Sequence, residues 1–275
     1  MDDRSGMRTR FALVFAGTLL AAWSFVVSCG GGAPTESPQA SRPSPSVELV
    51  VSAASDLSPV LAELGPLLKE SAGITFAANL GSTGQLMEQI VAGARVDVFL
   101  AASSTAVEQL DDKGLLVPGS ARLYARGRLV MWTREDAGLK VDTIADLAGP
   151  DVKRISIANP DHAPYGEAAR EALESAGLWD RLQDKIVPAE NVRQAFQFAE
   201  SGNVDVGLVA LSLVATGGGT YTLVSEELYG PIHQTLAIIA TSTHQEQAAQ
   251  FVAFLTGSRG REILLKHGFV LPEED

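Results

Sequence analysis

The feature that most constrains this chain is a repeated alternation of apolar, strand-like runs with stretches of helical spacing. A β-rich run at 48–53 leads into 57–71, where apolar residues recur at helical spacing before Gly73 ends the helix. Further strands are predicted at 74–80, 96–101, 128–133, 154–158, 186–189, 204–210 and 235–240, and helices at 85–92, 105–113, 143–147, 166–175, 192–200, 245–255 and 259–267. This alternation predicts an α/β fold of mostly parallel sheet flanked by helices.

The first 46 residues differ from the rest of the chain. Three arginines precede an apolar run at 11–27, and Cys29 follows that run. This order predicts an export signal at 1–28, with Cys29 as the lipidated first residue of the mature protein; an uncleaved anchor is the alternative. Residues 29–46 are rich in Gly, Pro, Ser and Thr, which predicts a flexible tether.

Composition excludes several functions for the remaining part of the chain. It has roughly 230 residues, enough for one large domain or two small ones. The whole chain has a net charge of −12, which provides no basic surface for nucleic acid. Four scattered histidines and one cysteine predict no metal cluster, and no cofactor is expected. Because the chain has neither a Gly-x-Ser-x-Gly elbow nor a P-loop, it is not expected to be an enzyme.

An internal echo suggests two similar lobes. Residues 89–102 and 197–210 both run from a helix through a glycine stop and a Val-Asp-Val sequence into an apolar strand. The alternative is that any βα unit tends towards this pattern. Two α/β lobes would place a ligand cleft between them, at the carboxyl ends of strands.

Four strand-to-helix turns contain small hydrogen-bond donors and no nucleophile–base pair; they lie at 54–56, 81–84, 163–166 and 190–193. The start of a helix presents unpaired backbone N–H groups and the positive end of the helix dipole. Several such helix starts aimed at one point would bind a small oxyanion without a metal ion or a fixed positive charge. Distant surface carboxylates are screened by solvent, so an acidic protein can still bind an anion in this way.

Five motifs, taken in order over residues 47–269, resemble the periplasmic molybdate-binding proteins, which are the substrate-capturing components of ABC importers. They are Ala53-Ala54-Ser55; Gly-Ser-Thr-Gly at 81–84 with Leu86 and Gln89-Ile90; Ala-Gly-Ala-x-Val-Asp-Val-Phe at 92–99; Asn159-Pro160-x-His162-x-Pro164-x-Gly166; and Pro188-Ala189-Glu190-Asn191-Val192-Arg193.

The resemblance implies a two-lobed, type II periplasmic binding protein fold that closes over one oxyanion. The chain crosses twice between the lobes, with residues 47–124 plus 230–275 forming lobe 1 and residues 125–229 forming lobe 2. The expected ligand is molybdate or tungstate, which the sequence does not separate. The expected partner is an ABC permease, and the protein is expected to be a monomer, exported to the periplasm or lipid-anchored on the outer face of the cytoplasmic membrane.

The resemblance also implies the ligand contacts. Ser55 and Thr83 match hydroxyl donors, and Ser82 adjoins the second of them. Tyr165 and Val192 match positions whose backbone N–H groups reach the ligand. Many members of the family have a further tyrosine at the position of Ala210, and we hypothesise that the Tyr165 hydroxyl replaces it.

Structural interpretations compete at several of these positions. Ser55 could serve only as an N-cap, but Ser58 is expected to be the N-cap of the helix, with Pro59 in its first turn, which would free Ser55 for the ligand. Asp56 is expected to face solvent and support the helix N-terminus. If its carboxylate pointed at the ligand, it would accept a hydrogen bond and would therefore favour a protonated oxyanion such as hydrogen phosphate. His162 is expected to be structural, in the turn before Pro164.

Three other functions remain open at this stage. The protein could bind another tetrahedral oxyanion, such as sulfate or phosphate. It could be a membrane-tethered oxyanion sensor that uses the same pocket. The hydrolase alternative is weaker, because the catalytic motifs are missing.

Overall fold

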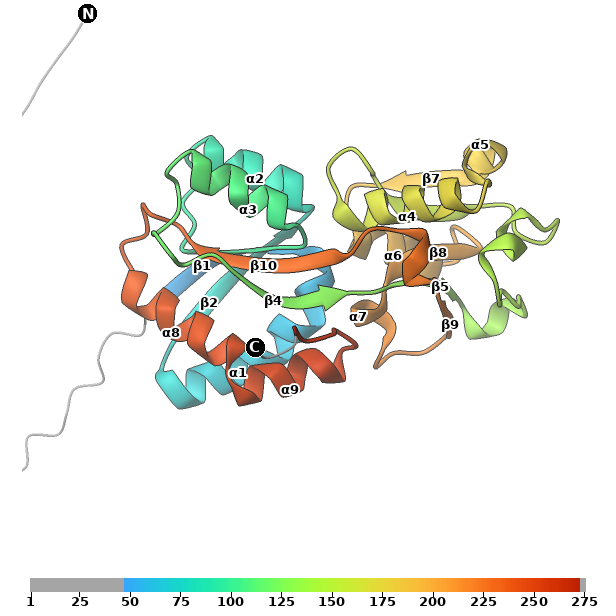
Figure 1. Cartoon of the computed structure of the whole chain (residues 1–275). Helices are drawn as coiled ribbons and strands as arrows, with labels where there is room; N and C mark the ends of the chain where they lie inside the picture. The colour runs from blue at the N-terminus through green and yellow to red at the C-terminus, as the bar shows by residue number, and fades with distance from the viewer. Residues whose placement is uncertain (1–46, 273–275) are drawn as a thin grey trace, which may run out of the picture. The chain divides into compact units, whose positions relative to one another are not determined.

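The computed structural model describes residues 47–272, which form two lobes, each built around a five-stranded sheet (Figure 1). The predicted export signal, Cys29 and the tether lie outside the described residues. The first sheet has the strand order β2 (Thr75–Gly81), β1 (Glu48–Ala54), β3 (Val98–Ala101), β10 (Ile232–Ile238) and β4 (Arg122–Gly127). The second has the order β7 (Ile186–Ala189), β6 (Ile155–Ala158), β8 (Val206–Ala210), β5 (Leu129–Thr133) and β9 (Thr220–Leu223).

The two sheets share one pairing pattern. In the first, β1 pairs in parallel with β2 and β3, and β10 runs antiparallel to β3 and β4. In the second, β6 pairs in parallel with β7 and β8, and β5 runs antiparallel to β8 and β9. The predicted α/β architecture is therefore confirmed: each sheet is mixed, with two parallel and two antiparallel pairings, and the two lobes are similar in topology.

The aspartates of the repeated Val-Asp-Val sequence have the same structural role in each lobe. The Asp97 carboxylate accepts a hydrogen bond of 2.8 Å from the N–H of Val50 in β1. The Asp205 carboxylate accepts bonds of 2.7 and 2.8 Å from the N–H groups of Lys153 and Arg154, just before β6. Each aspartate thus satisfies backbone donors near the start of the first parallel strand of its sheet, which explains the echo in the sequence.

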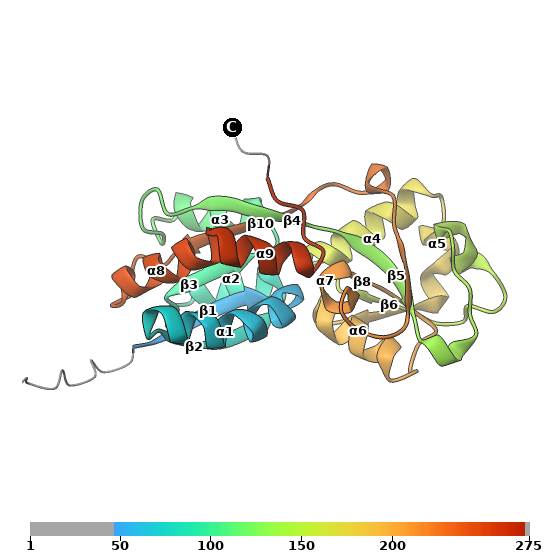
Figure 2. The ribbon, with the colours of Figure 1, turned by 90° about the horizontal axis from the view of Figure 1, so that it is seen from below.

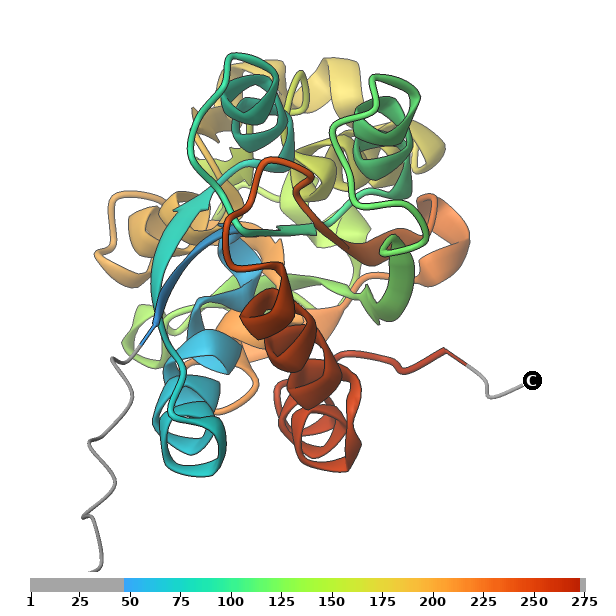
Figure 3. The same cartoon turned by 90° about the vertical axis from the view of Figure 1, so that its left-hand side faces the viewer.

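Helices cover both faces of the first sheet (Figure 3). On one face lie α1 (Ser58–Ala72), α8 (Gln245–Thr256) and α9 (Ser258–Lys266), and on the other α2 (Thr83–Val91) and α3 (Ser104–Asp112). The second sheet packs against α4 (Pro164–Ser175) and α6 (Val192–Glu200), which lie on its opposite faces (Figure 2). The shorter helices of the second lobe are α5 (Trp179–Leu182) and α7 (Leu211–Val214). Short 3-10 helices occupy Ser55–Leu57, Glu135–Ala137, Ile144–Ala148, Gln183–Lys185 and Glu226–Leu228.

The chain passes from the first sheet to the second between β4 and β5, and it returns before β10. At the first crossing Gly127 lies against the side chain of Tyr165, because a Cβ atom built on Gly127 would stand 2.0 Å from the tyrosine hydroxyl. The lobe boundaries expected at 124/125 and 229/230 stay predictions. The sequence pattern missed β4, the strand that spans the first of them.

The start of α1 differs from the prediction. Pro59 lies in the first turn as expected, but Ser58 is the first helical residue rather than the N-cap. The N-cap position belongs to Leu57, which has no side-chain cap, because the 3-10 helix Ser55–Leu57 leads directly into α1. The predicted helix end at Gly73 is confirmed, since this glycine has a left-handed φ of 67°.

No helix within residues 47–272 combines the length and the apolar character needed to cross a bilayer.

Candidate functional site

The residues predicted to contact the ligand meet in one small cavity. It is small, with a volume of about 10 Å³, far below the 300–1,000 Å³ typical of sites for drug-sized molecules. Its lining comes from both lobes: Ala54, Ser55, Asp56, Gly81, Ser82, Thr83 and Ala102 from the first, and Ala163, Pro164, Tyr165 and Val192 from the second. All five predicted contact residues are in this set.

The hydroxyl oxygens of Ser55 and Thr83 each accept a hydrogen bond from a backbone N–H. Ser55 Oγ accepts from Arg193 in the other lobe at 3.3 Å. Thr83 Oγ1 accepts from Ala102 at 3.0 Å. Because a hydroxyl that accepts a bond still has its own proton, each can donate to a ligand oxygen in the cavity. Both residues are only 2% exposed, so their hydroxyl protons face acceptors inside the protein and not bulk solvent.

Ser82 makes a different contact. Its hydroxyl lies 2.8 Å from Nδ1 of His162, which belongs to the other lobe. The His162 carbonyl accepts a 2.9 Å bond from the N–H of Gly84. A Cβ atom on Gly84 would stand 2.9 Å from that carbonyl oxygen, so the glycine permits this close approach. His162 thus joins the start of α2 to the second lobe, a link that the sequence did not predict.

The second lobe presents helix starts to the cavity. Val192 is the first residue of α6, and its N-cap Asn191 accepts a side-chain hydrogen bond from the N–H of Gln194. Tyr165 follows Pro164, which begins α4. The first N–H groups of a helix have no partner within the helix and lie at its positive end. The backbone at Tyr165 and Val192 is therefore suited to an anion, while the Val192 side chain packs in the core of the second lobe.

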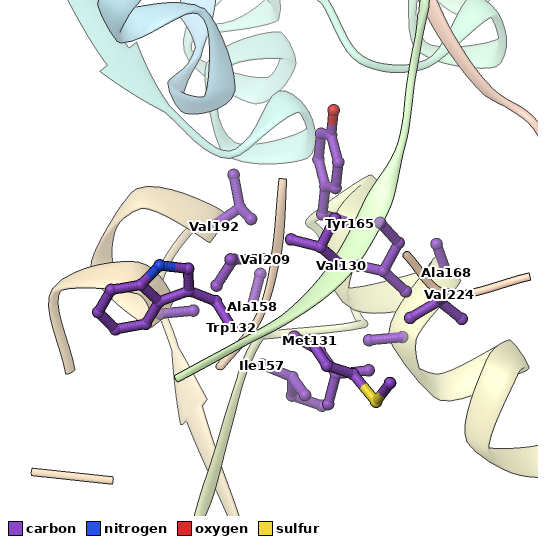
Figure 4. Packing of buried hydrophobic residues seen from close by; sticks show 14 of the residues in the cluster. Val130, Met131, Trp132, Ile157, Ala158, Tyr165, Ala168, Val192, Val209 and Val224 are labelled. Carbon is purple, nitrogen blue, oxygen red and sulfur yellow. The ribbon is translucent and has the colours of Figure 1, made fainter. Parts of the chain in front are cut away.

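The Tyr165 ring packs at the edge of the same core, and its hydroxyl end points towards the first lobe. Figure 4 shows its ring directed away from labelled neighbours such as Met131 and Ile157, with the hydroxyl at the far end. The hydroxyl is buried and makes no hydrogen bond. Burial, followed by the charge of Asp56, raises the pKa of Tyr165 well above its usual value, so the hydroxyl keeps its proton and remains a donor.

The expectation that Asp56 faces solvent is wrong, because its side chain is completely buried. Oδ2 accepts a 2.7 Å bond from Nε2 of Gln234, and the backbone carbonyl accepts a 2.8 Å bond from Oγ of Ser212. Oδ1 has no hydrogen-bond partner. Burial raises the pKa of Asp56 to about 6, against smaller opposing effects led by the nearby Tyr165 hydroxyl. That hydroxyl is near enough to influence the carboxyl but does not form a regular hydrogen bond with it.

Ala210 does not line the cavity. It is completely buried, precedes α7 and packs in the core of the second lobe.

Sequence reasoning missed part of the site. It did not predict that the N–H groups of Ala102 and Arg193 would engage the two hydroxyls, or that Gln234 would contact Asp56. The sequence did contain one signal for Arg193, because it lies in a predicted helix-start turn. Gln234 lies 178 positions from Asp56 and gave no signal. Within residues 47–272, no group of three or more His, Cys, Asp or Glu side chains is arranged to hold a metal ion.

A two-lobed fold with a small, donor-lined interlobe cavity is typical of solute-binding proteins. Residues 49–270 match the model of the bacterial extracellular solute-binding protein family, and the chain belongs to that family. Its relatives include the molybdate-binding proteins ModA of Rhodobacter capsulatus and Azotobacter vinelandii. Each is 34% identical over 229 residues; the match covers 83% and 82% of this chain, respectively, and 90% of each relative.

A solved structure supports the same relationship. The periplasmic molybdate-binding protein of Azotobacter vinelandii superposes with a TM-score of 0.78 at 34% identity, covering 82% of this chain and all of that one. The resemblance inferred from the sequence motifs and the two-lobed periplasmic binding protein fold are both confirmed.

Proposed function

We propose that this protein captures molybdate or tungstate outside the cytoplasmic membrane and delivers it to an ABC permease. The observation that carries the proposal is the convergence of Ser55, Ser82, Thr83, Tyr165 and Val192 on one small cavity between two lobes. The molybdate-binding relatives support the choice of ion, because they match nearly the whole folded part of the chain.

The donor set suits a tetrahedral dianion. Such an ion has four acceptor oxygens, while the predicted contacts are hydroxyl and backbone N–H donors that carry no formal charge. Charge-assisted hydrogen bonds contribute about 1.5–3 kcal/mol each. Six of them, less the costs of closure and desolvation, correspond to about 8–10 kcal/mol, which is micromolar or tighter binding.

Ion size and protonation state provide the selectivity. Sulfate has shorter bonds than molybdate and would fit a rigid cavity less closely. Hydrogen phosphate has a proton that needs an acceptor, and a site made only of donors leaves that proton unpaired. One observation favours phosphate as a second candidate: the Asp56 carboxyl group borders the cavity and has an oxygen without a partner.

A panel of anions tests the proposal. Thermal shift and titration calorimetry with molybdate, tungstate, sulfate and phosphate should give strong stabilisation by the first two ions and little by the others. A response to phosphate alone would overturn the assignment. Turnover of generic esters or phosphate esters by the same preparation would instead support a hydrolase.

The location and the delivery step need separate experiments. We propose that Cys29 carries a lipid anchor, so the full chain should be found with membranes, whereas a Cys29→Ser variant should be released. Delivery predicts molybdate uptake when the protein is supplied with its permease and ATPase. Signalling through a membrane partner without uptake would favour the sensor alternative.

A further inference from the structure

A buried polar cluster lies directly behind the cavity. Asp56 contributes a carboxyl group that is completely buried, and Oδ2 accepts a bond from Gln234 on β10. Gln234 in turn accepts a 3.4 Å bond from the hydroxyl of Tyr124 on β4. Tyr165 approaches the same carboxyl from the second lobe. Two atoms of this cluster, Asp56 Oδ1 and the Tyr165 hydroxyl oxygen, are buried without a hydrogen-bond partner, and both residues line the cavity.

Among residues 47–272, no cation acts on the Asp56 carboxylate to balance its charge. The influences on Asp56 are burial, the side chains of Tyr165 and Gln234, and the backbone N–H groups of Asp56 and Leu57. The titratable groups that face it are Tyr165 from α4 and Tyr124 from β4, and Tyr229 lies beyond Tyr165. These tyrosines have raised pKa values and stay neutral near pH 7. A dianion that entered the cavity would therefore meet an uncompensated negative charge, which is costly in a buried site.

We propose that Asp56 is a specificity-determining residue whose carboxyl group takes up one proton from solvent when the dianion binds. The inference rests on the proposed function, since it requires an oxyanion in the cavity. The reaction balances in charge and protons: the dianion binds, one proton from water or buffer adds to the Asp56 carboxylate, and the complex contains the dianion and the neutral Asp56 acid. The neutral acid has an O–H group, so the unpartnered oxygen changes from a repelling group to a donor that can reach the anion.

Tyr165 is near Asp56 in the free protein and can contact the anion in the complex. In the free protein its hydroxyl lies near the carboxylate and lowers the pKa of that group. In the complex the same hydroxyl can turn to an anion oxygen, and the carboxyl group that loses this donor is neutralised. Asp56 thus selects a fully deprotonated anion by accepting the proton itself, whereas a fixed carboxylate would select a protonated anion.

Proton uptake predicts a defined pH window. The free carboxyl titrates at a pKa of about 6, and a nearby dianion raises that value further. Below about pH 6 the acid is neutral in both states, and the affinity does not depend on pH. Between the free and bound pKa values, one proton is taken up, and the affinity falls tenfold for each unit of rising pH. Above both values the carboxylate stays charged, and binding remains weak.

The test is titration calorimetry of the full chain with molybdate from about pH 6 to about pH 8.5, a range in which molybdate itself stays a dianion. Each titration is repeated in two buffers of different ionisation enthalpy, which counts the protons taken up. The wild type should take up close to one proton and lose affinity about tenfold per pH unit within the window. Asp56→Asn should take up none, give a flat profile and exceed the wild-type affinity at the highest pH.

A matched control shows whether the pH dependence belongs to Asp56 or to negative charge near the cavity in general. Glu167→Gln removes an exposed carboxylate in the first turn of α4, outside the cavity lining, and it should keep the wild-type pH profile. His162 contacts Ser82 of the cavity lining, so the proton count is also measured on His162→Gln, which should keep it; this assigns the proton to Asp56 even if Asp56→Asn folds poorly. Molybdate binding without proton uptake overturns the inference and leaves the proposed function intact. Preference for phosphate that Asp56→Asn abolishes would also overturn it, and absence of any oxyanion binding would overturn both proposals.

Discussion

The two lobes present different chemistry to the same cavity. The first lobe contributes side-chain groups: the hydroxyls of Ser55, Ser82 and Thr83 and the carboxyl group of Asp56. The second lobe contributes mainly backbone, at the helix starts that contain Tyr165 and Val192, together with one phenol. The sheets behind these surfaces have the same pairing pattern, so the difference lies in the turns and not in the framework.

This difference separates what each lobe controls. A single substitution can remove a side-chain donor, whereas a backbone N–H remains whatever side chain follows it. We therefore expect substitutions in the first lobe to change affinity and ion choice. In the second lobe, a substitution that only alters the side chain above a backbone donor, as at Val192, should change stability more than binding, whereas the Tyr165 phenol is a side-chain donor like those of the first lobe.

The largest expected effect is on the pH dependence of stability through Asp56. Its pKa is raised from 3.8 to about 6 in the folded protein, so the folded state holds the proton more tightly than the unfolded state does. Stability of the ligand-free protein should therefore fall as the pH rises from about 4 to about 6, by up to about 3 kcal/mol. Urea unfolding of wild type and Asp56→Asn should show this decline in the wild type only. Parallel profiles would contradict the assignment to Asp56.

The next effect concerns the Thr83 hydroxyl. Thr83→Ala removes a proposed donor and deprives the Ala102 N–H of its acceptor. Molybdate affinity should fall by about 2 kcal/mol, or roughly thirtyfold. Thr83→Ser keeps the hydroxyl and should retain most of the affinity. Equal affinities for the alanine and serine variants would show that this hydroxyl does not reach the ligand.

Tyr165→Phe tests the side-chain donor that the second lobe contributes to the described lining of the cavity. The hydroxyl makes no hydrogen bond in the free protein, so its loss should cost little in folding. Molybdate affinity should fall by about 1 kcal/mol, or roughly fivefold, if the phenol contacts the ion in place of the tyrosine missing at Ala210. Calorimetry that gives unchanged affinity would rule out this replacement.

The smallest change in affinity is expected for Val192→Ala. The substitution keeps the backbone N–H of α6 but removes methyl groups from the core of the second lobe. Affinity should change by less than about 0.5 kcal/mol, while the unfolding free energy falls by about 1–2 kcal/mol. A loss of affinity as large as that of Thr83→Ala would contradict the claim that Val192 contributes only its backbone to binding.

The fold was predictable where local pattern and tertiary structure agree. Helix α6 has the predicted bounds, and α1 ends at the predicted glycine. The sequence pattern missed β4 and β9, which are edge strands with several exposed residues and therefore lack a continuous apolar run. The predicted cap at Ser58 failed because a short 3-10 helix already continues the backbone into α1.

The site was predictable at turns but not at contacts between distant segments. Ser55, Thr83, Tyr165 and Val192 lie in turns with recognisable spacing. The burial of Asp56 depends on Gln234, far away in the sequence, and on Tyr165 from the other lobe. No local pattern contains that information, and the position of Asp56 beside a helix start by itself predicts a solvent-facing carboxylate.

The most direct test of the central claim is a crystal structure of the complex with molybdate, with anomalous scattering used to locate molybdenum. We predict one molybdenum peak in the interlobe cavity. Anion oxygens should lie within hydrogen-bond distance of the hydroxyls of Ser55 and Thr83 and of the backbone nitrogens of Tyr165 and Val192. An empty cavity, or molybdenum bound elsewhere on the protein, would contradict the proposed site.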